Sequence, residues 1–158
     1  MPSQVLSEQS LGVATFVALL RGNAAVTREL NAQLSVDHGL TISDYEVLLR
    51  LARAPERRMR RVDLAEEVLL TASGVTRLLD GLERGGLVER GSCATDRRVV
   101  YAVLTDSGLA TLREASESHL AQVDSFFATR YDEDELAALS TLLVRLAEGD
   151  AGSCEVPA

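Results

Sequence analysis

Apolar side chains recur at helical spacing along much of the chain, and residues 9–34 form the first such segment. A helix that is apolar on several sides is usually buried against more than one neighbour. In a chain of 158 residues, a first helix with so broad an apolar surface predicts contact with a partner subunit. The apolar positions of this segment are Leu11, Val13, Phe16, Val17, Leu19, Leu20, Ala24, Val26, Leu30 and Leu34.

Residues 43–54 and 62–69 carry the pattern of two short helices. Ser43 and Glu46 fit a capping box at the start of the first, and a proline follows its end. Between the two helices lies a run of arginines, in which we expect a short edge strand around Met59.

The next helix, residues 71–84, is sharply two-faced, and Gly85-Gly86 ends it. Its apolar stripe falls at positions i, i+3, i+4 and i+7, namely Val75, Leu78, Leu79 and Leu82. The opposite face carries Ser73, Gly74, Thr76, Arg77 and Asp80. Two strands are predicted next, at 87–90 and 99–104, with a polar hairpin tip at 91–98.

A long helix is predicted from Thr105, its N-cap, with a coiled-coil-like seam along one face. The acidic run 132–135 caps a last helix, and 149–158 is expected to be a flexible tail. The seam consists of Leu109, Leu112, Ser116, His119, Val123 and Phe126.

The predicted fold class is mainly α with a small β wing. Helix–helix–helix–hairpin is the order of a winged helix-turn-helix lobe, which we place at residues 41–104. Long dimerisation helices at 1–40 and 105–148 flank it, and the whole is expected to form a single domain.

Composition favours an ordinary globular protein, with 46% hydrophobic and 25% charged residues. No apolar run approaches the ~18 residues of a membrane helix, and the N-terminus does not resemble a signal peptide. Cys93 and Cys154 cannot build a disulfide framework, so we expect a cytoplasmic protein.

Charge is segregated along the chain. Residues 50–98 hold eleven arginines and eight acids, a net charge of +3, whereas the rest of the chain carries −11. A basic middle between acidic flanks fits a DNA-reading module in a larger scaffold, although a solvated basic patch would give the same sum.

The two-faced helix suits the major groove of DNA, which is wide enough to admit a helix. Ser73 and Thr76 can bond phosphate oxygens and base edges, and Arg77 can bond guanine in a bidentate pair. Gly74 would let the backbone approach a phosphate closely. At the hairpin tip, Arg97 and Arg98 suit a narrow minor groove, and Asp96 is expected to orient Arg98.

At these residues the sequence resembles the MarR (multiple-antibiotic-resistance regulator) family, most closely over residues 41–108. The resemblance implies a homodimeric transcriptional regulator, usually a repressor, that binds a pseudo-palindromic operator. It also implies a small aromatic or phenolic effector bound between the dimerisation helices and the lobe. Carried over by position, Ser73, Thr76 and Arg77 would read the major groove, and Arg97 or Arg98 the minor groove. The matching stretches are 63–66, 73–90, 96–98 and 104–108.

An effector site is predicted only from placement near the helix junctions. His119 is either a packing histidine or a polar group of a ligand pocket that also includes Arg21, His38 and Tyr45. Cys93 lies beside basic residues that favour a thiolate, so a thiol-based redox regulator is an alternative. The first 92 residues hold no cysteine, which argues against the family's peroxide-sensing mechanism. Two histidines, far apart in sequence, argue against a zinc site, and no metal or cofactor is expected.

An enzyme is not expected, because the catalytic and phosphate-binding motifs of the common enzyme classes are missing from the sequence. The serious competitor to a DNA-binding regulator is a winged helix that binds protein. Salt dependence separates them, since phosphate contacts weaken steeply as salt rises.

Overall fold

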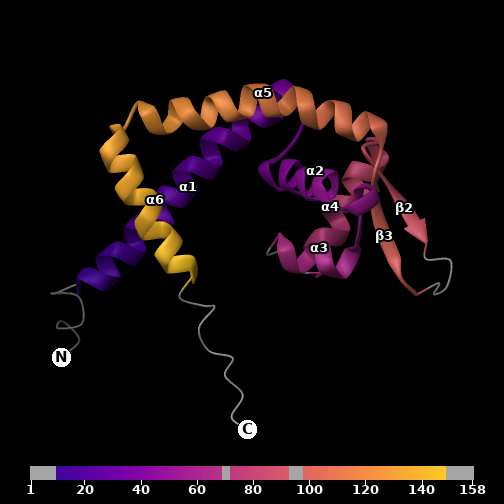
Figure 1. The fold of residues 1–158 in the computed structure, drawn as a ribbon, viewed down its shortest axis with the longest axis horizontal. Helices are drawn as coiled ribbons and strands as arrows, with labels where there is room; N and C mark the ends of the chain where they lie inside the picture. Colours follow the sequence, from indigo (N-terminus) through magenta and orange to yellow (C-terminus); the bar gives the residue numbers. More distant parts are fainter. Residues whose placement is uncertain (1–9, 69–71, 93–97, 149–158) are drawn as a thin grey trace, which may run out of the picture. The chain divides into compact units, whose positions relative to one another are not determined.

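The computed structural model describes residues 10–68, 72–92 and 98–148, and Figure 1 shows their arrangement in helices and strands. The first helix in the described part of the chain is the 28-residue α1 (Leu11–His38). The lobe follows as α2 (Ile42–Arg53), the 3-10 turn η1 (Pro55–Arg57), β1 (Arg58–Arg60), α3 (Arg61–Glu67), α4 (Ala72–Arg84), β2 (Val88–Ser92) and β3 (Val100–Leu104). The last helices are α5 (Asp106–Ala128) and α6 (Glu133–Glu148).

The turn between α1 and α2 is fixed by two local devices. Gly39 has a φ of 66°, a left-handed conformation that glycine adopts without strain, and it ends α1. Thr41 then caps α2: its hydroxyl accepts from the Asp44 amide at 3.1 Å, and the Asp44 carboxylate accepts from the Thr41 amide at 2.8 Å. The predicted capping box at Ser43 and Glu46 is therefore wrong by two residues, because Thr41 and Asp44 meet the same requirement one half-turn earlier.

The three strands form one antiparallel sheet in the order β1-β3-β2. Ala102 at the centre of β3 pairs with Met59 on one side and Arg90 on the other. The expected edge strand around Met59 is confirmed, and so are the two strands of the wing. The winged helix-turn-helix fold class is thus observed.

The lobe has one apolar core, to which α2, α3, α4 and the sheet all contribute. Val47, Leu48 and Leu51 of α2 are fully buried, as are Leu64 of α3 and Leu79 of α4. The core fixes α4 by one face and leaves its other face at the surface.

The start of α5 is tied to the wing by close packing and hydrogen bonds. The Thr105 hydroxyl donates to the Gly86 carbonyl at 2.7 Å and accepts from the Gly108 amide at 2.9 Å, which confirms Thr105 as the N-cap. A Cβ on Gly108 would overlap the carbonyl oxygen of Leu87, so only glycine fits this position.

Contacts divide the chain into two units, residues 1–119 and 120–158. In the second unit, Asp132 and Glu135 form reciprocal caps at the start of α6, which confirms the predicted acidic cap. The Arg130 guanidinium lies 3.7 Å from the ring centroid of Phe126.

Large apolar side chains remain exposed in each unit. On α1 they are Leu11, Val13, Phe16, Leu19, Leu20 and Val36, and on α6 they are Leu142, Leu143, Val144 and Leu146. Two of the apolar positions predicted for the first helix, Leu30 and Leu34, are buried in this chain. Across the described residues, no helix combines the length and the apolar character needed to cross a membrane.

Candidate nucleic-acid interface

Helix α4 separates its apolar and polar residues as the sequence pattern indicated. Val75, Leu79 and Leu82 are buried in the core. Ser73, Thr76 and Arg77 are exposed and Gly74 is half-buried, so the predicted reading face is at the surface. Arg77 forms no hydrogen bond or ion pair with the described part of the chain, which leaves its guanidinium available to a ligand.

Arg98 lies just before β3 and is exposed. Two other predicted wing residues, Asp96 and Arg97, lie outside the described residues, as do Cys93 and Cys154. The expected hydrogen bond between Asp96 and Arg98 is therefore untested.

A hollow of about 340 Å³ lies between helix α4 and the base of the wing. Thr76 of α4 and Arg98 both line it, so the structure brings together residues 22 positions apart in the sequence. Arg60 and Arg61 also line this hollow, and Nη2 of Arg61 is buried without a hydrogen-bond partner within the described ranges. The sequence interpretation treated these arginines only as a basic connector, and their proximity to Thr76 was not predicted.

A salt-bridge network connects helix α4 to strand β2. The Arg90 Nε donates to both carboxylate oxygens of Glu83, at 2.9 and 2.8 Å, and an Nη atom of Arg90 donates to Asp80 at 2.9 Å. The hydrogen bonds that Arg90 donates to Glu83, and then the charge of Glu83, raise the pKa of Arg90 above its ordinary value. Because both acids lie on α4, Arg90 fixes the wing strand against that helix.

Known proteins share this architecture and this sequence pattern. A model of the MarR family matches residues 38–99. AbsC, a MarR family transcriptional regulator from Streptomyces coelicolor, is 31% identical, with a TM-score of 0.79 over 93% of this chain and 99% of its own. The chain belongs to the MarR family of transcriptional regulators.

Two further proteins extend the comparison. Sco3205 from Streptomyces coelicolor, solved in complex with DNA, is 27% identical, with a TM-score of 0.80 over 90% of this chain and 89% of its own. The regulator MhqR of Bacillus subtilis is 26% identical over 89% of this chain and 93% of its own. These names favour a regulatory role over an enzymatic one.

Three of the four predicted effector residues gather where α1, α2 and α5 meet. The rings of Tyr45 and His119 have centroids 4.7 Å apart. The Tyr45 hydroxyl lies 3.0 Å from Oγ of Ser116, and Nε2 of His38 lies 2.8 Å from Oγ of Ser118. Arg21 is on α1 but 17 residues before His38, which corresponds to roughly 25 Å along a helix.

His119 is buried, with 8% of its surface exposed. Its Nδ1 has no hydrogen-bond partner among residues that the structure describes, and burial lowers its pKa below the ordinary value. The contact with the Tyr45 ring is what a packing histidine would make. The Nδ1 atom without a hydrogen-bond partner is what a ligand-binding histidine would offer.

Proposed function

We propose that this MarR family member is a homodimeric repressor that works in the cytoplasm, binds a pseudo-palindromic operator and is released by a small aromatic or phenolic ligand. The observation that carries the proposal is the division of α4 into a core face and an exposed face with Ser73, Thr76 and Arg77. A surface helix presented in this way can enter a major groove.

The DNA contacts divide by type. Arg77 is the residue for base reading, because an arginine can bond guanine O6 and N7 together. Ser73 and Thr76 form hydrogen bonds with phosphate oxygens and base edges, and Gly74 allows the backbone to approach a phosphate closely. Arg97 or Arg98 binds the minor groove, and Asp96 orients Arg98. The complex of the related Sco3205 with DNA supports this reading of the fold.

The exposed apolar side chains support a homodimer. Leu11, Phe16 and Leu20 of α1 expose 84%, 59% and 52% of their surfaces, and Leu146 of α6 exposes 64%. Large exposed apolar side chains gathered on one helix in this way mark protein interfaces. Sedimentation should therefore give a dimer at micromolar concentration, and a monomer would refute this part. In the dimer, operator half-sites should lie about 10 base pairs apart, one turn of the duplex.

The effector site we propose is the cluster of His38, Tyr45 and His119, with the more distant Arg21 from the same prediction. The unpaired Nδ1 of His119 supports a ligand that carries a hydroxyl or a carboxyl group. We expect His119→Ala to fold normally but to lose the release from DNA that the ligand causes. An unaltered response would remove His119 from the site.

The test of DNA binding is selection of genomic fragments by the purified protein at two salt concentrations. The wild type should enrich an inverted repeat, and Arg77→Ala/Arg98→Ala should lose it. Arg77→Ala alone should cost about 1–3 kcal/mol and relax base preference at one position. Arg113→Ala is the matched control, because Arg113 is an exposed arginine on α5. This variant should enrich the inverted repeat as the wild type does.

Two outcomes would contradict the proposal. If refolded protein, freed of any carried ligand, enriches nothing at low salt, the winged helix does not read DNA. If it captures a partner whose binding is insensitive to salt, it binds protein instead, since DNA contacts through phosphates should weaken with a log–log slope of about −0.9 per phosphate.

A further inference from the structure

The hollow between helix α4 and the base of the wing is lined by three arginines and, among the residues that the structure describes, by no acid. Arg60 belongs to β1, Arg61 begins α3, and Arg98 precedes β3 by two residues. Two other hollows of the lobe differ, because the lining of each includes two carboxylates. The charge of this lining therefore favours an anion.

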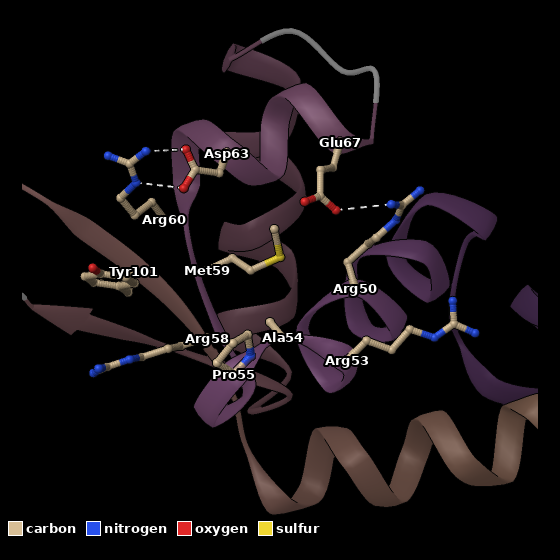
Figure 2. Close-up of a pocket in the computed structure, with 10 residues that line it drawn as sticks. All are labelled: Arg50, Arg53, Ala54, Pro55, Arg58, Met59, Arg60, Asp63, Glu67 and Tyr101. Carbon is tan, nitrogen blue, oxygen red and sulfur yellow. Dashed lines mark hydrogen bonds and ion pairs between the residues drawn. The ribbon is translucent and has the colours of Figure 1, made fainter. Parts of the chain in front are cut away.

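Arg61 is the arginine of this lining whose charge is left uncompensated. Its side chain is half-buried, and it forms no ion pair or side-chain hydrogen bond with residues 10–68, 72–92 or 98–148. Arg60, in contrast, donates to both carboxylate oxygens of Asp63, at 2.7 and 2.6 Å (Figure 2). A partly buried guanidinium without a counter-ion is costly, because it has lost water and gained no acceptor. An anion in the hollow would offset this charge.

The hollow lies where a strand of DNA backbone has to pass, and this step rests on the proposed function. In that function α4 enters a major groove, and the wing reaches the minor groove beside it. Adjacent grooves of a duplex are separated by one sugar–phosphate backbone. Thr76 of α4 and Arg98 at the base of the wing both line the hollow. The backbone between the two grooves therefore runs across it.

The rest of the lining suits a phosphodiester better than a free anion. Val62 and Val100 both line the hollow, and they expose 62% and 37% of their surfaces. Apolar side chains beside a cation can contact the deoxyriboses that flank a phosphate in DNA. Inorganic phosphate has no apolar part to place against them.

We propose that Arg61 binds one DNA phosphate in each half-site, in the backbone between the major groove entered by α4 and the minor groove reached by the wing. Arg60 and Arg98 add positive charge to the same hollow. A guanidinium can donate to two phosphate oxygens at once, which gives the contact both strength and direction. Such a contact carries no sequence information, and it fixes the register of α4 on the duplex.

The test measures affinity for the selected operator by fluorescence anisotropy over a range of salt concentrations. Arg61→Gln should weaken binding at least about tenfold, as expected for the loss of a charged hydrogen bond. It should also make the log–log salt slope shallower by about 0.9 for each half-site, because one phosphate contact is lost there. Base preference should stay as in the wild type, whereas Arg77→Ala should relax it.

Two further variants separate the charge of Arg61 from its shape and from a general effect of charge. Arg61→Lys should keep the salt slope of the wild type but bind more weakly, because lysine keeps the charge and loses the two-pronged contact. Arg113→Gln removes an exposed arginine on α5 and should bind like the wild type. Arg61 has no ion-pair partner to lose in the described chain, so Arg61→Gln should fold normally.

Neutral methylphosphonates, placed one at a time along the operator, locate the phosphate on the DNA. At one position in each half-site, between the two grooves, this substitution should weaken binding by the wild type. The same substitution should have a much smaller effect on Arg61→Gln, because the contact is already lost. Equal effects on the two proteins at every position would overturn the proposal.

Failure of this inference and failure of the proposed function give different results. If the wild type enriches no DNA, the proposed function fails and this inference falls with it. If the wild type binds the operator and Arg61→Gln binds it with the same affinity and salt slope, only the role of Arg61 is overturned. Saturable binding of inorganic phosphate at micromolar concentration, lost in Arg61→Gln, would make the hollow a site for a free anion and would also overturn the proposal.

Discussion

Gly108→Ala tests how the wing is joined to the long helix α5. An ideal Cβ at residue 108 would overlap the carbonyl oxygen of Leu87, and it would lie 2.9 Å from the carbonyl carbon of Leu87 and 2.7 Å from Cδ1 of Leu104. The obstacle is backbone, so it cannot rotate away. That carbonyl also accepts a hydrogen bond from the Thr105 amide at 3.1 Å, which a shift would stretch or break.

The expected loss of stability follows from these contacts. Overpacking costs about 1–3 kcal/mol, and an unpaired buried backbone group costs about 1–3 kcal/mol. The helix preference of alanine over glycine returns about 1 kcal/mol. The net loss should be about 1–5 kcal/mol, which for a chain of this length lowers Tm by roughly 2–20 °C.

The matched control is Gly81→Ala on α4. Nothing lies within 4 Å of the added Cβ, and Gly81 is exposed inside a helix. This change should raise stability by about 0.5–1 kcal/mol. Thermal unfolding by circular dichroism at one fixed protein concentration measures both, because dimer formation makes Tm depend on concentration. A Gly108→Ala protein as stable as the wild type would refute the packing argument.

Two further predictions concern the charged and titratable groups. Arg90→Gln should lower stability only slightly, since the Arg90 side chain is itself exposed and such ion pairs are weak, yet it should weaken DNA binding several-fold because β2 is no longer fixed to α4. Fluorescence anisotropy on the selected operator measures this effect, and an affinity equal to that of Arg113→Gln would contradict it. Burial lowers the pKa of His119 below 6.5, so the unfolded chain takes up a proton more readily and the contribution of His119 to stability falls as pH drops below 6.5. An NMR titration of the His119 ring should give a midpoint below 6.5, and a midpoint at or above that value would rule out the burial effect.

The sequence alone determined the order and type of the elements, because hydrophobic periodicity records which face of each element is buried. The stripe of Val75, Leu79 and Leu82 predicted both helix α4 and its orientation, and the core confirms it. The edge strand around Met59 and the Thr105 cap were also correct. The start of α2 was displaced, because Thr41–Asp44 and Ser43–Glu46 both satisfy the local rule for a capping box.

The tertiary structure decided which distant side chains meet. Arg90 could be paired with Asp80 and Glu83 only once β2 lay beside α4, and Tyr45 met His119 only once α2 packed on α5. The hollow lined by Arg53, Met59, Asp63 and Tyr101 likewise draws residues from α2, β1, α3 and β3, which no single periodic pattern connects (Figure 2). Local propensity acts over a few residues, whereas a binding site depends on which elements the core brings into contact.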